Sequence, residues 1–260
     1  MTVAPAPAGR WDEPILAVVL PLASAAVFLF LWQAVVTLAG LPEAILPPPL
    51  AVLGQFFASL PELLRQARVT VLDSVVAFAI ATAVGVALAS CFTFSGTLRD
   101  AVYPNLVLLQ LIPKIALAPL FVVWLGVGAP SRVIFAVFIS FFPIVLSTAT
   151  GLASTDAYAL KLCRALGASP WQIFIRVRVP FALSHFFTGL KIATTLVFIG
   201  IVVGEFISSN AGLGHYILLA GAVGATSRIF VGLIALSLSG LAFYGAVVAA
   251  ERLVQRWWWE

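Results

Sequence analysis

The chain has 260 residues, of which 62% are hydrophobic and 9% charged, and its formal net charge is +4. A composition this apolar excludes an ordinary water-soluble domain and is typical of a protein that crosses the membrane several times. The modest positive charge is spread over the segments between apolar runs, so it does not indicate a nucleic-acid partner. We expect an all-α fold, because lipid offers backbone polar groups no other partner and the alternation of barrel strands is absent.

The N-terminal part contains one predicted span and a long connection. Residues 1–14 are rich in Pro and Ala, and we expect a flexible N-terminal segment outside the membrane. The apolar run that follows is too long for a signal peptide, so residues 15–38 are the first predicted span. Residues 41–68 form a loop with a Pro triplet and two short helical pieces, the second of which, residues 61–71, is expected at the membrane interface.

Further apolar runs bring the expected number of transmembrane helices to about six. They lie at residues 71–94, 102–125, 133–152, 181–203 and 229–250. The transmembrane domain therefore covers residues 15–250, followed by a cytoplasmic tail at 251–260. The second span carries small residues at four-residue spacing, a pattern that lets helices pack closely: Ala77, Ala81, Gly85 and Ala89. Residues 206–227 begin with too many polar residues for a span, and we expect a loop followed by a short re-entrant or interfacial helix.

Lys114 is a charged residue near the middle of the third predicted span. A charge there costs about 3 kcal/mol on insertion scales, so such a residue usually faces a protein interior or an aqueous path. Pro113 and Pro119 would loosen the helical hydrogen bonding and can open a gap in the helix. One hypothesis is that Lys114 lines the translocation route and favours anionic cargo; the other is that it pairs with a buried carbonyl or carboxylate for folding.

Two more charged residues belong to the fifth predicted span. Lys191 lies near its cytoplasmic third and is expected to snorkel to the headgroups rather than to face a pathway. Glu205 closes the same helix on the outer side. It either ties an outer gate to the loop at 210–214 or ends a helix in water.

The connection between the fourth and fifth spans, residues 155–180, is the most basic loop of the chain, with Lys161, Arg164, Arg176 and Arg178. It is either a docking surface or a topology anchor, because Lys and Arg accumulate in cytoplasmic loops regardless of function. With this loop in the cytoplasm, six spans place both termini there too. The cytoplasmic side then holds about twice as many basic residues as the outer side.

The Gly, Ser and Pro residues of this loop predict a helix, a tight turn and a second helix. Gly167 fits the left-handed position after a helix end. Ser169 can cap the next helix, with Pro170 at its first position and Gln172 completing a capping box. Pro180 is expected to break or kink that second helix.

Motifs for common chemistry are absent from the sequence. It contains no phosphate-binding G-x-x-x-x-G-K-[ST], no H-E-x-x-H and no G-x-S-x-G elbow, and it has only two histidines, His185 and His215. We therefore expect no catalytic residues, no metal site and no cofactor. The two cysteines, Cys91 and Cys163, give no disulfide framework.

The basic loop resembles the cytoplasmic loop of ABC-importer permeases, which is known for an E-A-A, Gly, I-x-x-P pattern. Residues 164–169 (RALGAS) match its Gly-centred part and residues 177–180 (VRVP) match its end. Residues 161–163 (KLC) replace the E-A-A and put a base where the family has an acid. The residues that the resemblance assigns to ATPase coupling are Lys161, Arg164, Ala165, Leu166, Gly167, Ala168, Ser169, Pro170 and Pro180.

Similarity to these permeases extends from about residue 40 onward. The motifs are LPPP at 46–49, IPKIALAPL at 112–120 before WLG, and GEF at 204–206 before GLG at 212–214. They look like the subgroup that serves nitrate, sulfonate and taurine. For the translocation path and gate, the candidates are Pro113, Lys114, Pro119 and Glu205.

The resemblance implies the fold and organisation of a type I importer in the bacterial inner membrane. Its partners would be two cytoplasmic ATPase subunits, a second permease copy (expected to be identical) and an extracytoplasmic solute-binding protein. The expected cargo is a small anion such as a sulfonate, taurine, nitrate or an aromatic carboxylate. The alternative is an ion-coupled carrier or channel, but such carriers keep acids at mid-span, whereas Asp73 and Glu205 lie near span ends.

Overall fold

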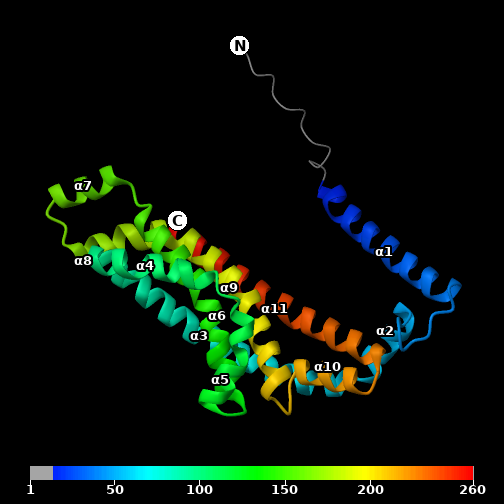
Figure 1. Ribbon diagram of the computed structural model, residues 1–260. Coiled ribbons are helices and arrows are strands. Elements are labelled where there is room, and N and C mark those ends of the chain that lie inside the picture. Colours follow the sequence, from blue (N-terminus) through cyan, green and yellow to red (C-terminus); the bar gives the residue numbers. More distant parts are fainter. Residues whose placement is uncertain (1–13, 260) are drawn as a thin grey trace. The chain divides into compact units, whose positions relative to one another are not determined.

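The computed structural model describes residues 14–259, so residues 1–13 of the predicted N-terminal segment, and residue 260, lie outside the described residues. Within residues 14–259 every regular element is a helix. In chain order (Figure 1) they are α1 Pro14–Leu38, α2 Pro49–Ala58, α3 Leu60–Phe94, α4 Gly96–Gln110, a 3-10 turn Lys114–Leu117, α5 Ala118–Leu125, α6 Ala129–Ala153, α7 Ala157–Ala165, α8 Pro170–Ile173, a π-helical turn Phe174–Arg178, α9 Val179–Ser208, α10 Leu213–Ala222 and α11 Thr226–Trp259.

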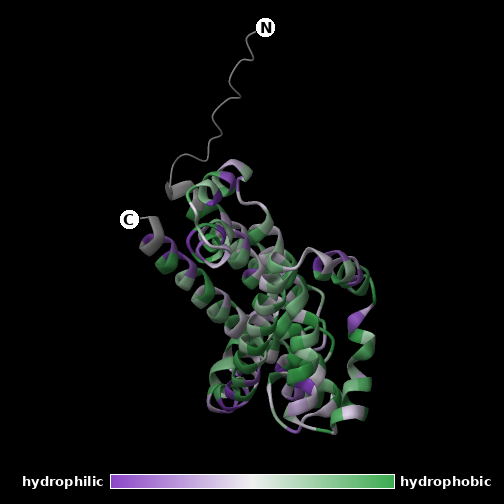
Figure 2. Cartoon of the chain, turned by 90° about the vertical axis from the view of Figure 1, so that its left-hand side faces the viewer, coloured by the Kyte–Doolittle hydropathy of each residue, from purple (hydrophilic) through white to green (hydrophobic). Residues whose placement is uncertain are grey.

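Five of these helical stretches are long and apolar enough to cross a membrane, and α4 with the following turn and α5 forms a sixth if the bent pair counts as one span. Figure 2 shows hydrophobic residues along most of the long helices and hydrophilic ones gathered toward helix ends and connections. This confirms the predicted all-α polytopic fold with about six transmembrane helices.

Helix α3 runs without a break through the predicted start of the second span. The separate interfacial helix expected at residues 61–71 is therefore wrong, because those residues are the first turns of α3. Pro61 sits in the first turn, where a missing N–H costs no hydrogen bond, and no Gly or Pro follows until Gly85. The small-residue stripe on α3 is buried as predicted, at Ala77, Ala81, Gly85 and Ala89.

The third predicted span is not one straight helix. Helix α4 ends at Gln110, and the chain turns by 92° before the segment that ends in α5. Pro113 lies in the break, because it donates no hydrogen bond and disfavours a helical conformation at the residue before it. The predicted gap is thus confirmed at Pro113, whereas Pro119 lies in the first turn of α5 and breaks nothing.

The C-terminal elements partly differ from expectation. Residues 206–227 contain a loop followed by the short helix α10, as predicted. Helix α11 continues through the predicted tail as far as Trp259, and the cytoplasmic position of that tail stays a prediction. No Gly or Pro interrupts residues 246–259, so nothing in the sequence ends the helix at residue 250.

The chain divides into two compact units, residues 1–60 with 220–231, and residues 61–219 with 232–260. In the described part of the first, Thr226 Oγ1 donates a 2.5 Å hydrogen bond to the carbonyl of Ala44, and the rings of Trp32 and Phe230 lie 5.2 Å apart. The second unit contains the buried core between α3, α6 and α9.

Helices α6 and α9 approach each other closely along three glycines of α9. A Cβ at Gly200 would lie 2.7 Å from the Cα of Ala136, and one at Gly204 would lie 2.9 Å from the Cα of Arg132. At Gly189 the Cβ would lie 2.9 Å from a backbone carbonyl of α6. Real Cβ atoms do not approach this closely, so a larger residue at any of the three would push the helices apart.

Candidate functional site

A buried carboxylate near the end of α9 organises one end of the second unit. Glu205 is 0% exposed, and it accepts hydrogen bonds from Thr70 Oγ1 of α3 at 2.7 Å and from the backbone N–H of Gly214 at 2.6 Å. Thr70 Oγ1 in turn accepts a hydrogen bond from the N–H of Leu213 at 2.8 Å. Glu205 therefore joins α9, α3 and the start of α10.

The loop before α10 lies directly against this carboxylate. Gly212 has φ +108°, a conformation that residues with a Cβ rarely adopt, and a Cβ there would collide with the carboxylate of Glu205. Its N–H donates to Gln66 Oε1 of α3 at 2.7 Å. We call Gln66, Thr70, Glu205 and residues 212–214 the Glu205 network. The alternative in which Glu205 merely ends a helix in water is wrong.

A second polar contact lies beside the Glu205 network. Arg132 at the start of α6 is 8% exposed, and its Nε donates to Asp73 of α3 at 2.5 Å. The Nη1 of Arg132 also donates to Ser209 Oγ at 3.1 Å, in the loop between α9 and α10. No sequence pattern links Arg132 to Asp73, because the two residues lie 59 positions apart on different helices.

Lys114 lies at the helix break rather than inside a continuous span. Its Nζ donates to the carbonyl of Gln110 at 3.1 Å and lies 5.1 Å from the ring centre of Phe142 on α6. Pro113 is adjacent, and both residues are part of the break. Pro113 and Lys114 lie at the break and Pro119 follows in α5, whereas Glu205 contacts Thr70 and Gly214. The four residues predicted for the path therefore do not form one cluster.

Lys191 forms an ion pair that the sequence did not predict, and its expected reach to the headgroups stays a prediction. Its Nζ lies 2.8 and 3.0 Å from the two carboxylate oxygens of Glu251 on α11. The two side chains are 28% and 13% exposed, respectively. The pair joins α9 to α11 and explains how a lysine is kept on an apolar helix.

The first helix of the basic loop and the turn after it form as the sequence predicts. Helix α7 ends in a Schellman arrangement, in which Gly167 N–H donates to Arg164 and Ala168 N–H donates to Cys163, each at 3.0 Å. Gly167 has φ +78°, which favours glycine at this position. At the other end, the carboxylate of Asp156 accepts hydrogen bonds from the first turn of α7.

The second helix of the loop starts with the predicted capping box. Ser169 Oγ accepts from the N–H of Gln172 at 3.2 Å, and Gln172 Oε1 accepts from the N–H of Ser169 at 2.8 Å. Pro170 occupies the first turn. Pro180 does not break the helix, since helical structure continues from residue 170 to 208, whereas the alternative of a kink at Pro180 stays a prediction. A widened π-helical turn precedes Pro180 and accommodates its ring.

Helix α7 presents an apolar surface that nothing in the described chain covers. Tyr158, Leu162 and Leu166 follow one another at four-residue spacing and are 80%, 61% and 78% exposed. No residue of α7 is buried. The predicted coupling residues 161–170 lie together on α7, the turn and α8, whereas Pro180 lies apart in α9. Figure 1 shows α7 and α8 near the end of α3, where Phe94 packs on Phe174 with ring centres 4.9 Å apart.

Comparison with known proteins decides what kind of membrane protein this is. Residues 79–257 match the model of a family described as binding-protein-dependent transport system inner membrane component. The chain belongs to this family of ABC-transporter permeases. It is therefore a multi-pass inner-membrane subunit of an ABC importer, and ATP hydrolysis is performed by a separate subunit. The alternative of an ion-coupled carrier or channel does not hold.

The permease has relatives along nearly its whole length. It is 34% identical to a probable ABC transporter permease protein of Haemophilus influenzae, over 92% of this chain and 97% of the relative. It is 35% identical to the riboflavin transport system permease protein RibX of Chloroflexus aurantiacus, over 95% and 92%. Other relatives are named for formylaminopyrimidine, aliphatic sulfonates and taurine.

A solved structure shares the fold. The chain aligns with a permease chain of the inward-facing MetNI methionine ABC transporter with a TM-score of 0.65 and 20% identity, over 76% of this chain and 98% of that chain. The permease thus has the fold of an ABC importer permease, as the sequence motifs implied.

Proposed function

We propose that this permease forms, with a second and identical copy, the path by which a small anion enters the cell. An extracytoplasmic binding protein delivers the solute, and two cytoplasmic ATPase subunits drive the cycle through residues 155–180. With that loop in the cytoplasm, the order of the spans puts both chain termini on the cytoplasmic side. The translocation domain would cover residues 15–250.

The exposed apolar face of α7 carries this proposal. Tyr158, Leu162 and Leu166 form a row of apolar side chains on a helix without any buried residue, which is typical of a surface that binds a partner. The adjoining turn is held by the Gly167 and Ser169 caps, so the surface has a defined shape. Helical structure then continues to residue 208, which gives a continuous route for movement from the loop into the membrane.

The cargo proposal is based on Lys114 and on two of the relatives. Lys114 lies half-exposed at a break between helices, and among the described residues its partners are a carbonyl and an aromatic face, so its charge remains available to an anion. Relatives named for aliphatic sulfonates and taurine support an anionic solute. The higher identity to a riboflavin permease favours a neutral heteroaromatic solute as the second candidate.

Leu162→Asp tests the docking surface. The charge at the centre of the apolar row should weaken binding of the ATPase by at least about tenfold, because buried apolar contacts at an interface centre tolerate no unpaired charge. The measurement is co-purification of the ATPase with the tagged permease. Ala157→Asp adds the same charge at the first turn of α7, outside the row, and should leave the complex intact. Equal recovery of the ATPase with both variants contradicts the proposal.

Lys114→Met tests the cargo. Removal of the charge should lower uptake of an anionic solute by about tenfold, the effect of one charge-assisted hydrogen bond, while the amount of permease in the membrane stays constant. Lys114→Arg should retain most of the uptake. Uptake measured in whole cells at matched permease levels decides the matter. Unchanged anion uptake in Lys114→Met rejects a pathway role for this residue.

A further inference from the structure

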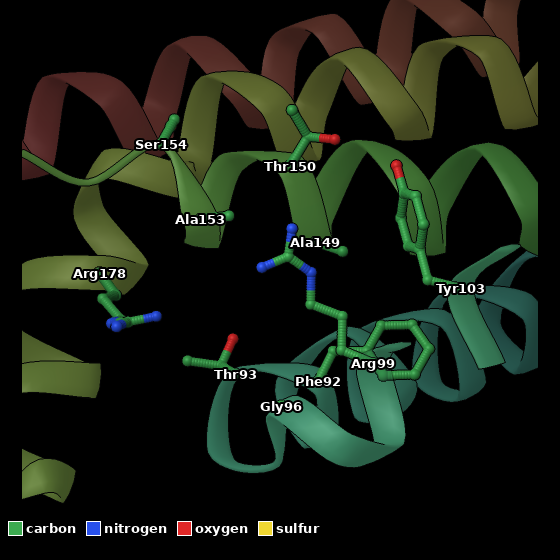
Figure 3. A pocket seen from close by; sticks show the side chains of 10 residues that line it. All are labelled: Phe92, Thr93, Gly96, Arg99, Tyr103, Ala149, Thr150, Ala153, Ser154 and Arg178. Atoms are coloured by element: carbon green, nitrogen blue, oxygen red, sulfur yellow. The ribbon is translucent and has the colours of Figure 1, made fainter. Parts of the chain in front are cut away.

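A pocket of about 480 Å³ lies at the end of the second unit near α8, where several helices end. Pockets of about 300–1,000 Å³ are the size that holds small molecules and headgroup-sized ligands. Its lining comes from the end of α3, the start of α4, the end of α6 and the π-helical turn (Figure 3): Phe92, Thr93, Gly96, Arg99, Tyr103, Ala149, Thr150, Ala153, Ser154 and Arg178.

Two guanidinium groups reach toward this pocket from opposite sides, Arg99 from α4 and Arg178 from the π-helical turn (Figure 3). Within residues 14–259 neither arginine takes part in an ion pair. To the described residues Arg178 donates a single hydrogen bond, a long one of 3.4 Å to the carbonyl of Leu152. Most of the donors of these two groups therefore remain available to a ligand.

A smaller pocket of about 310 Å³ shares Thr93 and Arg178 with the first one and adds Arg164 from the end of α7. Three guanidinium groups thus surround two adjoining hollows, and no acidic side chain of the described chain lines either of them. Like charges brought together in this way repel one another, and a bound anion would relieve the repulsion. The hydroxyl of Tyr103 supplies a further donor, whereas the hydroxyl of Thr93 donates to the carbonyl of Ala89 and offers a ligand only its acceptor lone pairs.

The position of the pocket indicates what kind of anion it meets. Most of its lining residues lie within a few positions of the ends of α3 and α6 or of the start of α4, so we expect the pocket at the level where these helices leave the apolar part of the membrane. Lipid phosphates lie at this level, and basic pockets between transmembrane helices bind anionic headgroups. Arginine matches phosphate oxygens with paired donors.

We propose that the pocket between Arg99 and Arg178 binds a phosphate-type oxyanion, and that its source is the headgroup of an anionic phospholipid. The ligand would join the ends of α3, α4 and α6 to the turn that leads from the basic loop into α9. The amount of anionic lipid in the membrane would in that way affect the position of the π-helical turn between α8 and α9.

Native mass spectrometry of the full-length permease in detergent, titrated with phosphatidylglycerol, phosphatidylcholine or glycerol phosphate, tests the proposal. We expect phosphatidylglycerol adducts on the wild-type protein and about tenfold weaker binding by Arg99→Gln and by Arg178→Gln, as loss of a charge-assisted hydrogen bond predicts. Arg99 is exposed, so its variant should fold even if Arg178→Gln does not.

Arg176→Gln is the matched control, because Arg176 lies in the same π-helical turn but is exposed and does not line the pocket. It should bind phosphatidylglycerol like the wild type. If glycerol phosphate binds the wild type as strongly as phosphatidylglycerol does, and both arginine variants lose that binding, the oxyanion site is supported but its ligand is a soluble phosphate compound and not a lipid. Equal binding of phosphatidylcholine, or undiminished binding by both Arg99→Gln and Arg178→Gln, overturns the proposal.

Discussion

Replacement of Glu205 by alanine is expected to lower the free energy of unfolding by about 3–5 kcal/mol. The change leaves the hydroxyl of Thr70 and the N–H of Gly214 without their acceptor in a buried site, and it opens a cavity beneath Gly212. Each unsatisfied buried donor costs about 1–3 kcal/mol, which makes this the largest effect on stability that we predict. Thermal unfolding of the purified permease in detergent measures the loss.

Two further variants separate this effect from loss of a negative charge. Glu205→Gln keeps the volume and one carbonyl acceptor, so it should be destabilised by roughly half as much. Glu43→Ala removes an exposed carboxylate and should stay within about 0.5 kcal/mol of the wild type. If Glu205→Ala unfolds at the wild-type temperature, the hydrogen bonds of the Glu205 network do not hold α3, α9 and α10 together.

Gly167→Val is expected to reduce uptake by about five- to thirtyfold while the permease still inserts into the membrane. Valine in a left-handed conformation costs about 1–2 kcal/mol, and at φ +78° the turn would have to change its shape. A Cβ at Gly167 meets no atom within 4 Å, so the effect would come from the backbone conformation and not from a clash. The turn is where we place the contact with the ATPase.

ATP hydrolysis by the reconstituted transporter should therefore be retained while its uptake falls. Gly245→Val is the matched control: its Cβ also meets nothing within 4 Å, but its φ is not positive. We expect that control to transport normally. A Gly167→Val permease with wild-type uptake would show that the shape of this turn does not matter for coupling.

Local features of this chain were readable from the sequence because they depend on neighbours a few residues away. The Gly167 turn and the Ser169–Gln172 capping box are determined by residue types at fixed spacing, and both are confirmed. The buried stripe on α3 follows from the period of the helix in the same way. Of the break or kink predicted at Pro180, the break is wrong, because a π-helical turn precedes the proline and the helix continues, and no residue pattern in the sequence predicts that turn.

Contacts between distant helices were not predictable from the sequence alone. Lys191 and Glu251 are 60 residues apart, and Asp73 and Arg132 are 59 apart. Whether such side chains meet depends on the rotation of each helix about its own axis, and no spacing rule encodes that rotation between separate helices. For the same reason the sequence left two roles open for Glu205, and only the packing of α3 and α10 against it decides that it is buried.

The three glycines along α9 have a mechanical consequence. Because the backbones of α6 and α9 lie so close at these glycines, little room remains between the two helices, and we expect them to move together during transport. The segments that open and close the translocation path would then move relative to the α6–α9 pair. The bend of 92° between α4 and α5, which carries Lys114, interrupts the helical hydrogen bonds, so we expect movement of the permease to be concentrated there.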